Sequence, residues 1–212
     1  GHGTSCLLRA SPPSLECLGE KLGGKEPPRI VVQPGQLAIG VHHACLSDHG
    51  QVKCWGTGDY GETVPPTLRN VTAIGVGTNH SCALDTNQVI CWGDTQSGVL
   101  QVPPLKQPYL LAVSGNKLPK IARVQSLALG PNGGCVIAQQ RVQCWGHDPD
   151  LTSTPPILRR PTKLSVGPNY ICAIDEDQLK CWGSPWGPAS DPHKQLIIKP
   201  THVAVGKNHA CV

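Results

Sequence analysis

Short apolar stretches alternate with polar turns along the chain, and the same alternation returns several times. From Cys45 onward, an alternating apolar stretch that ends in glycine precedes each repeated cysteine, as in "VTAIGVGTNHSC" and "TKLSVGPNYIC". A polar tip and a second apolar stretch ending in Trp-Gly follow, as in "DTNQVICWG" and "DEDQLKCWG". Period-two alternation with β-branched residues, broken at Gly or Asn, is typical of short antiparallel strands joined by tight turns. The pattern predicts an all-β protein, and no helical periodicity competes with it.

The cysteines set the period of this repeat. The pairs are Cys6 with Cys17, Cys45 with Cys54, Cys82 with Cys91, Cys135 with Cys144 and Cys172 with Cys181, and Cys211 is left over. The first cysteines of successive units stand 39, 37, 53, 37 and 39 residues apart, which is typical of one small supersecondary unit per repeat. We place the units near residues 1–30, 31–66, 67–120, 121–160 and 161–198, with a partial unit at 199–212. Together they form a single domain, or a fragment of one, spanning 1–212.

These residues resemble a known repeat family. The strand with its glycine, the step "NHSCAL" and the ending "VICWG" are similar to repeats of the regulator of chromosome condensation family, over nearly the whole chain. The resemblance implies a β-propeller of four-stranded antiparallel blades, with about five blades here, or seven if the chain is part of a longer ring. The family's "GQLG" after Trp-Gly is eroded here to "GDYGETV" and "DTQSGVL".

Paired cysteines are not a feature of the nuclear archetype of that family. They look more like the extracellular crinkly-type repeats of plant receptor kinases and like secreted bacterial relatives. The resemblance therefore implies a secreted or extracellular protein, and it argues against guanine-nucleotide exchange.

The cysteine spacing predicts one disulfide within each blade. If Cys82 and Cys91 lie on adjacent antiparallel strands, the chain between them forms a hairpin with Thr86 and Asn87 at its tip, and the two cysteines fall opposite each other. Directly opposed residues have Cα atoms roughly 4.5 to 5.5 Å apart, a distance that a disulfide accepts. Each bridge is expected to stabilise the fold by about 2.5 to 3 kcal/mol.

Metal binding is the alternative use of the 11 cysteines. Structural zinc sites use close cysteine pairs brought together in fours, whereas these pairs are wide and occur once per unit. So many cysteines that do not bind metal indicate an oxidising compartment. We therefore expect no metal and no cofactor.

The two ends of the chain fall at nearly the same point of the repeat. Cys211 occupies the first-cysteine position of a sixth unit, and Gly1 matches Gly77 and Gly206 in phase. Three explanations are open: a piece of a longer propeller, a five-bladed ring with an irregular seam, or completion by another chain. Cys211 is expected to be unpaired or to form an interchain bond. Open strand edges and an odd cysteine would permit self-association through the chain ends.

Two segments outside the repeat are candidates for partner binding. Trp186 in "GSPWGPAS" is a loop aromatic residue of the kind that anchors protein or sugar contacts. The long interval holds an insertion from Val102 to Lys120, and insertions in repeat proteins tend to form binding loops on one face. Its candidate contact residues are Tyr109, Leu110, Lys106 and Lys117. Packing under its own loop is the alternative for Trp186, and a plain surface loop is the alternative for the insertion.

The repeated polar and aromatic residues are better explained by structure. His43, His80 and His209 stand two residues before a first cysteine, and hydrogen bonding that fixes each turn against the next blade explains their periodicity better than metal binding does. The tryptophans that end four strands are expected to pack between blades. The acids of "DEDQ" are interpreted as a solvated hairpin tip.

Two asparagines match the glycosylation pattern. Asn70 in "NVT" lies between repeats and is the candidate acceptor in a eukaryotic secretory host, whereas Asn79 in "NHS" adjoins the expected disulfide turn.

The charge and the absence of known motifs reduce the number of function classes that the chain fits. The net charge of +4 is mild and its basic residues are scattered, so we expect no nucleic-acid partner, and no apolar run approaches the roughly 20 residues of a membrane span. No phosphate loop, nucleophile elbow or paired-carboxylate motif appears, so we expect no enzyme. The favoured function is a secreted or cell-surface module that binds a protein or glycan partner. The alternative is an assembly unit of an extracellular filament, sheath or wall, with interchain completion of the propeller.

Overall fold

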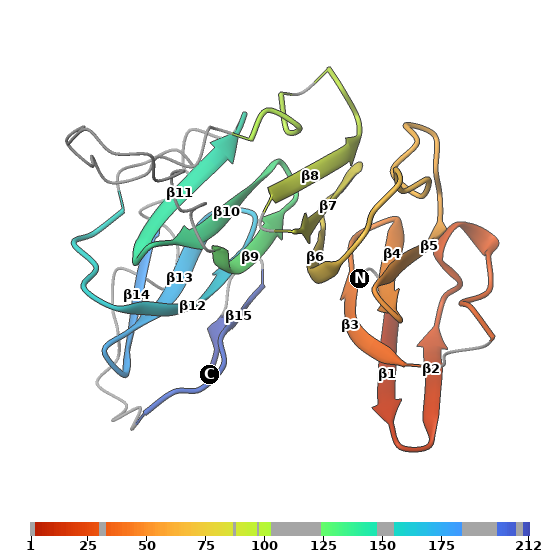
Figure 1. The fold of residues 1–212 in the computed structure, drawn as a ribbon, viewed down its shortest axis with the longest axis horizontal. Coiled ribbons are helices and arrows are strands. Elements are labelled where there is room, and N and C mark those ends of the chain that lie inside the picture. The colour runs from red at the N-terminus through yellow and green to blue at the C-terminus, as the bar shows by residue number, and fades with distance from the viewer. Residues whose placement is uncertain are drawn as a thin grey trace, which may run out of the picture.

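The computed structural model confirms the all-β class. It describes residues 3–29, 33–86, 88–96, 98–102, 124–147, 155–183, 199–206 and 210–212. Within these ranges the chain forms sixteen strands and one short 3-10 turn, η1 (Leu22–Gly24), with no α-helix. All strand pairs are antiparallel, and each sheet is built from strands consecutive in sequence (Figure 1).

The sheets follow the predicted repeat. The first unit is the pair β1 (Thr4–Ala10) and β2 (Pro13–Gly19). The second is β3 (Pro34–Ile39), β4 (His43–Asp48) and β5 (Gln51–Gly56), and the third is β6 (Val71–Val76), β7 (His80–Asp85) and β8 (Gln88–Gly93). The fourth is β9 (Val124–Gly130), β10 (Gly133–Ala138) and β11 (Arg141–Gly146), and the fifth is β12 (Pro161–Val166), β13 (Tyr170–Asp175) and β14 (Gln178–Gly183). The sixth is the short pair β15 (Ala204–Val205) and β16 (Ala210–Cys211).

Five disulfides join the predicted cysteine pairs, one in each of the first five units. Their positions are Cys6–Cys17, Cys45–Cys54, Cys82–Cys91, Cys135–Cys144 and Cys172–Cys181. In each unit the two cysteines are direct partners in the register of the hairpin, for example Cys82 opposite Cys91. The middle strand is buried along its whole length in all four three-stranded sheets. In these four units the bridge therefore joins the hairpin at its most protected strand.

Each complete sheet has three strands in the described residues, where four were expected. The chain that leaves the third strand runs on as a connection to the next unit, and proline pairs interrupt it at 27–28, 65–66 and 155–156. Proline has no backbone N–H and cannot donate to a strand ladder. This composition explains why no regular fourth strand forms at these positions.

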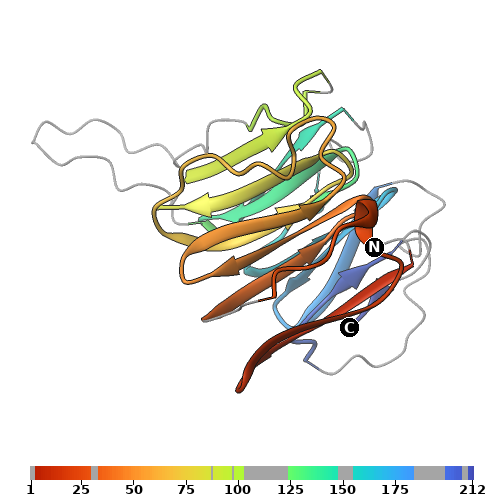
Figure 2. The same cartoon turned by 90° about the vertical axis from the view of Figure 1, so that its right-hand side faces the viewer.

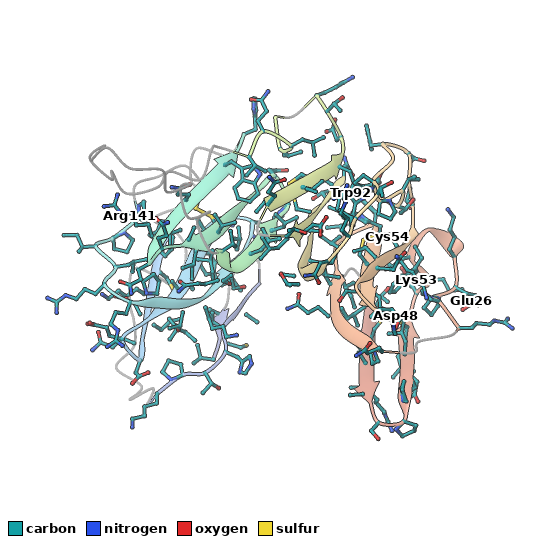
Figure 3. All side chains as sticks on the ribbon, in the orientation of Figure 1. Glu26, Asp48, Lys53, Cys54, Trp92 and Arg141 are labelled. Carbon is teal, nitrogen blue, oxygen red and sulfur yellow. A yellow bond between two sulfur atoms is a disulfide. The ribbon has the colours of Figure 1, made fainter. Side chains whose placement is uncertain are left out.

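The core lies between the sheets. Four buried clusters each combine residues of one unit with residues of the next. In the cluster between the second and third units, the Cys45–Cys54 bridge packs with Ile74, Ala83 and Trp92. Trp55, Trp145 and Trp182 take the same place in the other three clusters. The prediction that these tryptophans pack between blades is confirmed, and Figure 3 shows Cys54 and Trp92 at such a boundary.

The sheets are arranged around a common axis as the blades of a β-propeller. Figure 1 shows them in sequence around an arc, from β1 and β2 on one side to β15 on the other. Figure 2, turned by 90°, shows neighbouring sheets stacked face to face. Each sheet thus covers the apolar face of its neighbour, as repeat units that cannot bury that face alone must do.

Buried aspartates tie the end of a middle strand to the chain that enters the same unit. Asp85 accepts hydrogen bonds from the backbone N–H groups of Arg69 (3.0 Å) and Asn70 (2.6 Å). The Asn70 N–H bond is the largest influence lowering the pKa of Asp85, and it outweighs the opposing effect of burial. The carboxylate therefore holds the start of β6 against the end of β7.

Asp175, the equivalent of Asp85 in the fifth unit, corrects the interpretation of "DEDQ" as a solvated hairpin tip. Asp175 is fully buried, whereas Glu176 and Asp177 form the exposed tip. Burial acts to raise the pKa of Asp175, but hydrogen bonds from Lys180 (2.6 Å) and from the Arg160 (2.6 Å) backbone N–H hold it below its ordinary value. Only the last two acids of "DEDQ" are a solvated turn.

Candidate functional site

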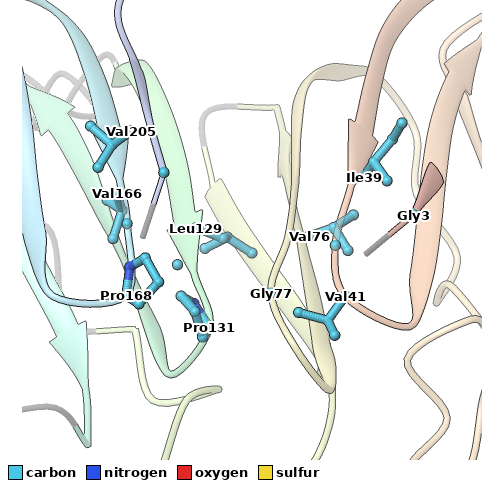
Figure 4. A pocket seen from close by; sticks show the side chains of 14 residues that line it. Gly3, Ile39, Val41, Val76, Gly77, Leu129, Pro131, Val166, Pro168 and Val205 are labelled. Atoms are coloured by element: carbon cyan, nitrogen blue, oxygen red, sulfur yellow. The ribbon is translucent and has the colours of Figure 1, made fainter. Parts of the chain in front are cut away.

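A cavity of about 610 Å³ lies at the axis, where all six units meet. The lining residues are the ends of the first strands and the turns after them. They are Gly3, Ile39, Gly40, Val41, Val76, Gly77, Leu129, Gly130, Pro131, Val166, Gly167, Pro168, Val205 and Gly206. Figure 4 shows side chains of the fourth to sixth units facing those of the second and third units across this space. The cavity exists because the same repeat position is presented once per unit.

Three glycines at the ends of first strands, Gly40, Gly130 and Gly167, let neighbouring units approach closely at the axis. A Cβ atom on Gly40 would lie 2.4 Å from the carbonyl oxygen of Gly77, and one on Gly167 would lie 2.5 Å from Val205 Cγ1. Both distances are shorter than real Cβ contacts allow. A backbone hydrogen bond from Gly40 N–H to the His43 oxygen (2.9 Å) fixes the turn that follows. Glycine is therefore required by contact with the next unit.

The walls of the cavity are aliphatic. Its lining consists of valine, isoleucine, leucine, proline and glycine, with no ionisable side chain among the described lining residues. The described part of the chain also contains no group of three or more His, Cys, Asp or Glu side chains that would hold a metal ion. Such a surface disfavours charged ligands, because burying a charge without a partner is costly. It favours an apolar group.

Beside the axis, the histidines that stand two residues before a first cysteine, His43 and His80, contact the next unit. His43 Nε2 lies 2.8 Å from the hydroxyl of Ser81 in the third unit. Burial lowers the pKa of His43 to about 4, and the nearby His80 lowers it further. Burial likewise lowers the pKa of His80 to about 4, against a backbone hydrogen bond with Gly133 of the fourth unit. These histidines are neutral structural contacts between units, as their spacing predicted.

Tyr170 occupies this position in the fifth unit. Its side chain is completely buried. Burial raises the pKa of its hydroxyl, and so does the Cys211 thiol of the sixth unit. The tyrosine therefore lies beside the following unit as the histidines do.

The contact between His43 and Ser81 resembles the pairing that activates a serine nucleophile. However, the Ser81 hydroxyl has the Glu62 carbonyl oxygen as a second acceptor, at 3.1 Å, and both groups lie in the contact between the two units. Both side chains are 0% exposed. Without access for a substrate, this pair serves as a contact that holds two units together.

Glu62 is a buried residue that sequence reasoning missed. It is 1% exposed and lies in the connection between the second and third units. Its carbonyl oxygen accepts a hydrogen bond from Trp92 Nε1 at 2.8 Å, and its carboxylate accepts one from the Tyr60 N–H at 2.9 Å. The connection is thereby fixed against the third unit, while Tyr60 and Val64 remain exposed on it.

The next connection repeats this arrangement with an apolar residue. The Val99 carbonyl oxygen accepts a hydrogen bond from Trp145 Nε1 at 2.8 Å, and Val99 is 2% exposed. Glu62 and Val99 both follow a glycine with positive φ, at Gly61 and Gly98. Aligning "GDYGETV" with "DTQSGVL" on this glycine pairs the two residues. That alignment was the available signal for the buried position of Glu62.

The sequence-predicted binding residues are not part of the described structure. Trp186, Tyr109, Leu110, Lys106 and Lys117 all lie outside the described residues, as does His209. The binding face that they would form stays a prediction. Cys211 is exposed and forms no disulfide with a described residue. Among the described residues, no helix has the length and apolar character to cross a membrane.

Comparison with solved structures supports the fold. The chain is similar to the ectodomain of the receptor kinase CR4 from Physcomitrella patens, with a TM-score of 0.68 and 23% identity over 96% of this chain and 53% of that one. It is also similar to the CRINKLY WD40 ectodomain of the Arabidopsis thaliana receptor kinase ACR4, with a TM-score of 0.65 and 23% identity over 97% of this chain and 69% of that one. The chain thus spans about half the length of the first of these proteins.

A third similar structure is yeast RCC1 (Prp20), solved bound to Kap60, with a TM-score of 0.62 and 17% identity over 87% of this chain and 54% of that one. No family model and no curated protein matches the chain. The fold is therefore that of the β-propellers built from regulator of chromosome condensation-like repeats. Within it, the disulfide-linked repeats have structural counterparts in receptor ectodomains.

Proposed function

We propose that the chain is an extracellular, non-catalytic binding module whose partner is a protein that inserts an apolar group into the axial cavity. The observation that carries this proposal is the cavity itself, formed by one repeat position of every unit and lined only by aliphatic residues and glycine. Its volume of about 610 Å³ lies within the range of ligand pockets, roughly 300 to 1,000 Å³.

The lining favours a protein over a glycan. A sugar brings many hydroxyl groups, and each one buried without a hydrogen-bonding partner costs free energy. The aliphatic side chains of the cavity offer no such partners. An apolar side chain on a partner loop fits this lining. Prp20 is described as binding Gsp1p and histones, which supports proteins as partners of this fold.

Five disulfides support the extracellular location. Disulfides persist in oxidising compartments and are rare in the reducing cytosol. The similar receptor kinase structures are ectodomains, which agrees with that location.

The test places charge at the mouth of the cavity. Val41 and Pro131 line the cavity, are half-buried and belong to none of the buried clusters, so Val41→Lys with Pro131→Lys should fold. Ile157→Lys, at a side chain that is 90% exposed and does not line the cavity, is the matched control. Immobilised protein is exposed to the native secretome, and captured proteins are quantified by mass spectrometry. We expect capture by the wild type and control, and at least tenfold loss with the double variant.

Two results contradict the proposal. One is equal capture by all three proteins once their disulfide masses and near-ultraviolet spectra match. The other is capture that survives complete proteolysis of the secretome and is lost on deglycosylation, which would identify a glycan partner.

Self-association is a second candidate, favoured by one observation. Leu7 is 52% exposed and Leu18 is 78% exposed, although the equivalent residues of the third unit, Ala83 and Trp92, are buried against the second unit. A second copy that covered this face would bury both leucines. Light scattering should then report a dimer or larger species that Leu18→Lys converts to a monomer. A monomeric wild type at high concentration would contradict this candidate.

A further inference from the structure

The chain contains two sequences that match the N-glycosylation pattern, and the structure distinguishes them. One is Asn70–Thr72, and the other is Asn79–Ser81. The first begins directly before β6, and the second runs from the turn after β6 into the start of β7. A glycan needs an exposed asparagine and room around it.

Asn70 meets that requirement. Its side chain is exposed, as are those of Arg69 and Thr72. Its backbone is already satisfied, because the N–H donates to Asp85 Oδ1 at 2.6 Å and the carbonyl oxygen accepts from the Thr86 N–H at 3.4 Å. A sugar on the side-chain amide therefore disturbs no backbone hydrogen bond, and the residue belongs to none of the buried clusters between units.

Asn79 does not meet it. The residue is half-buried in the turn beside the axis, and its carbonyl oxygen accepts from the Asp94 N–H at 2.9 Å. The hydroxyl that completes the pattern belongs to Ser81, which is 0% exposed and is bonded to both His43 and Glu62. A chain modified at Asn79 would have to place a large polar group against this contact between units.

We propose that Asn70 is N-glycosylated and that Asn79 is not. In the reaction, the Asn70 side-chain nitrogen forms a bond to C1 of the first sugar of a lipid-linked oligosaccharide. The bond from that carbon to the lipid pyrophosphate breaks, the pyrophosphate is the leaving group, and the amide proton passes to a base of the transferase. The inference rests on the proposed extracellular location, since only the secretory route supplies this donor.

The position of Asn70 has a consequence for binding. Asn70 precedes Val71, the first residue of β6, whereas the cavity residues Val76 and Gly77 lie at the other end of that strand. A strand rises about 3.3 Å per residue, so roughly 20 Å separate the two positions. The glycan therefore shields the face that carries the hairpin between β7 and β8 and leaves the axial turns uncovered.

The experiment expresses the chain with a secretion signal in a eukaryotic host and analyses the secreted, disulfide-bonded protein. Intact mass is measured before and after peptide-N-glycosidase, and glycosidase treatment in ¹⁸O-water marks the modified asparagine. We expect one glycan, located at Asn70. It should be absent from Asn70→Gln and from Thr72→Ala, which keeps Asn70, and unchanged in Asn79→Gln.

A secreted wild-type protein with five disulfides and no glycan would overturn the inference while leaving the extracellular location intact. A glycan on Asn79 of the folded protein would overturn it as well. Failure of the wild type to be secreted with its disulfides formed would contradict the extracellular location itself, and with it the inference.

Discussion

The first and third units have the same disulfide-linked hairpin but differ in what covers it. In the third unit the residue after the second cysteine is Trp92, which is 8% exposed against the second unit. In the first unit that position is Leu18, which is 78% exposed. The hairpin register is the same, with Cys6 opposite Cys17 and Cys82 opposite Cys91. Strand pairing is therefore a property of a single unit, whereas the core belongs to pairs of neighbours.

The largest predicted effect tests this contrast at one repeat position. Trp92→Ala removes a side chain that packs between units and donates a hydrogen bond to Glu62. We expect it to reduce the free energy of unfolding by about 3 to 5 kcal/mol. Leu18→Ala should stay within about 0.5 kcal/mol, because its side chain is exposed. Urea denaturation followed by tryptophan fluorescence and circular dichroism compares the two variants, and equal losses would refute the contrast.

The second prediction concerns the loss of folding stability at acidic pH. The folded protein holds His80 neutral down to about pH 4, whereas the unfolded chain takes up a proton near pH 6.5. Protons therefore favour the unfolded chain, so stability is full above pH 6.5 and falls as the pH drops to about 4. The loss is up to about 3 kcal/mol for His80, and a similar amount for His43, whose pKa is also about 4.

The first unit provides the control for this prediction. It has Thr4 at the position of His80, and threonine does not titrate. His80→Gln should lower the slope of stability against pH by about one proton between pH 6.5 and 4. Thr4→Val should leave that slope as it is. The measurement is urea denaturation at intervals of half a pH unit, and an unchanged slope in His80→Gln would be evidence against a buried, neutral histidine.

A smaller effect is expected at the aspartate position. Asp85→Ala leaves the backbone N–H groups of Arg69 and Asn70 without their acceptor, and we expect a loss of about 1.5 to 3 kcal/mol. Arg9 takes this place in the first unit, where it is exposed and lies 3.9 Å from Glu16. Arg9→Ala should cost no more than about 0.5 kcal/mol. Thermal unfolding at pH 7 ranks the two, and the reverse ranking would contradict the anchoring role of Asp85.

The smallest predicted effect concerns the rate at which the disulfides are reduced. Cys6 of the first unit is half-buried, whereas Cys82 is 0% exposed. A reductant reaches the exposed bridge sooner, so Cys6–Cys17 should open before Cys82–Cys91 under limiting reductant in native buffer. Alkylation with mass mapping at successive times gives the order. Simultaneous opening of the two bridges would show that reduction follows global unfolding.

Much of the fold could be predicted because the strands follow a period-two alternation of apolar and polar residues and because the cysteine spacing is regular. Period-two alternation placed the strands, and the spacing of Cys82 and Cys91 placed them opposite each other. The contact of His43 with the next unit followed from recurrence, since a residue repeated at a fixed point of a stacked unit meets its neighbour in the same way each time.

The rest depends on contacts that no local pattern records. Asp175 was interpreted as part of a solvated tip because "DEDQ" stands at the hairpin tip. The approach of Lys180 and of the Arg159 and Arg160 backbone makes it a buried anchor. No prediction was made for Glu62, which is buried where its carbonyl oxygen accepts a hydrogen bond from Trp92 of the next unit. The axial cavity was missed for the same reason, because it is made of turns that lie far apart in sequence.

The glycines Gly40, Gly130 and Gly167 at the ends of first strands fix more than a local contact. Gly40 allows the backbone of the third unit to come within reach of its own, and Gly167 does the same for the sixth. A side chain at these points would push adjacent sheets apart at their inner edge but leave their outer edges in place. Neighbouring sheets would then turn through a smaller angle, and more of them would be needed to complete a circle. The missing Cβ atoms of these glycines thus help to set how strongly the row of sheets curves.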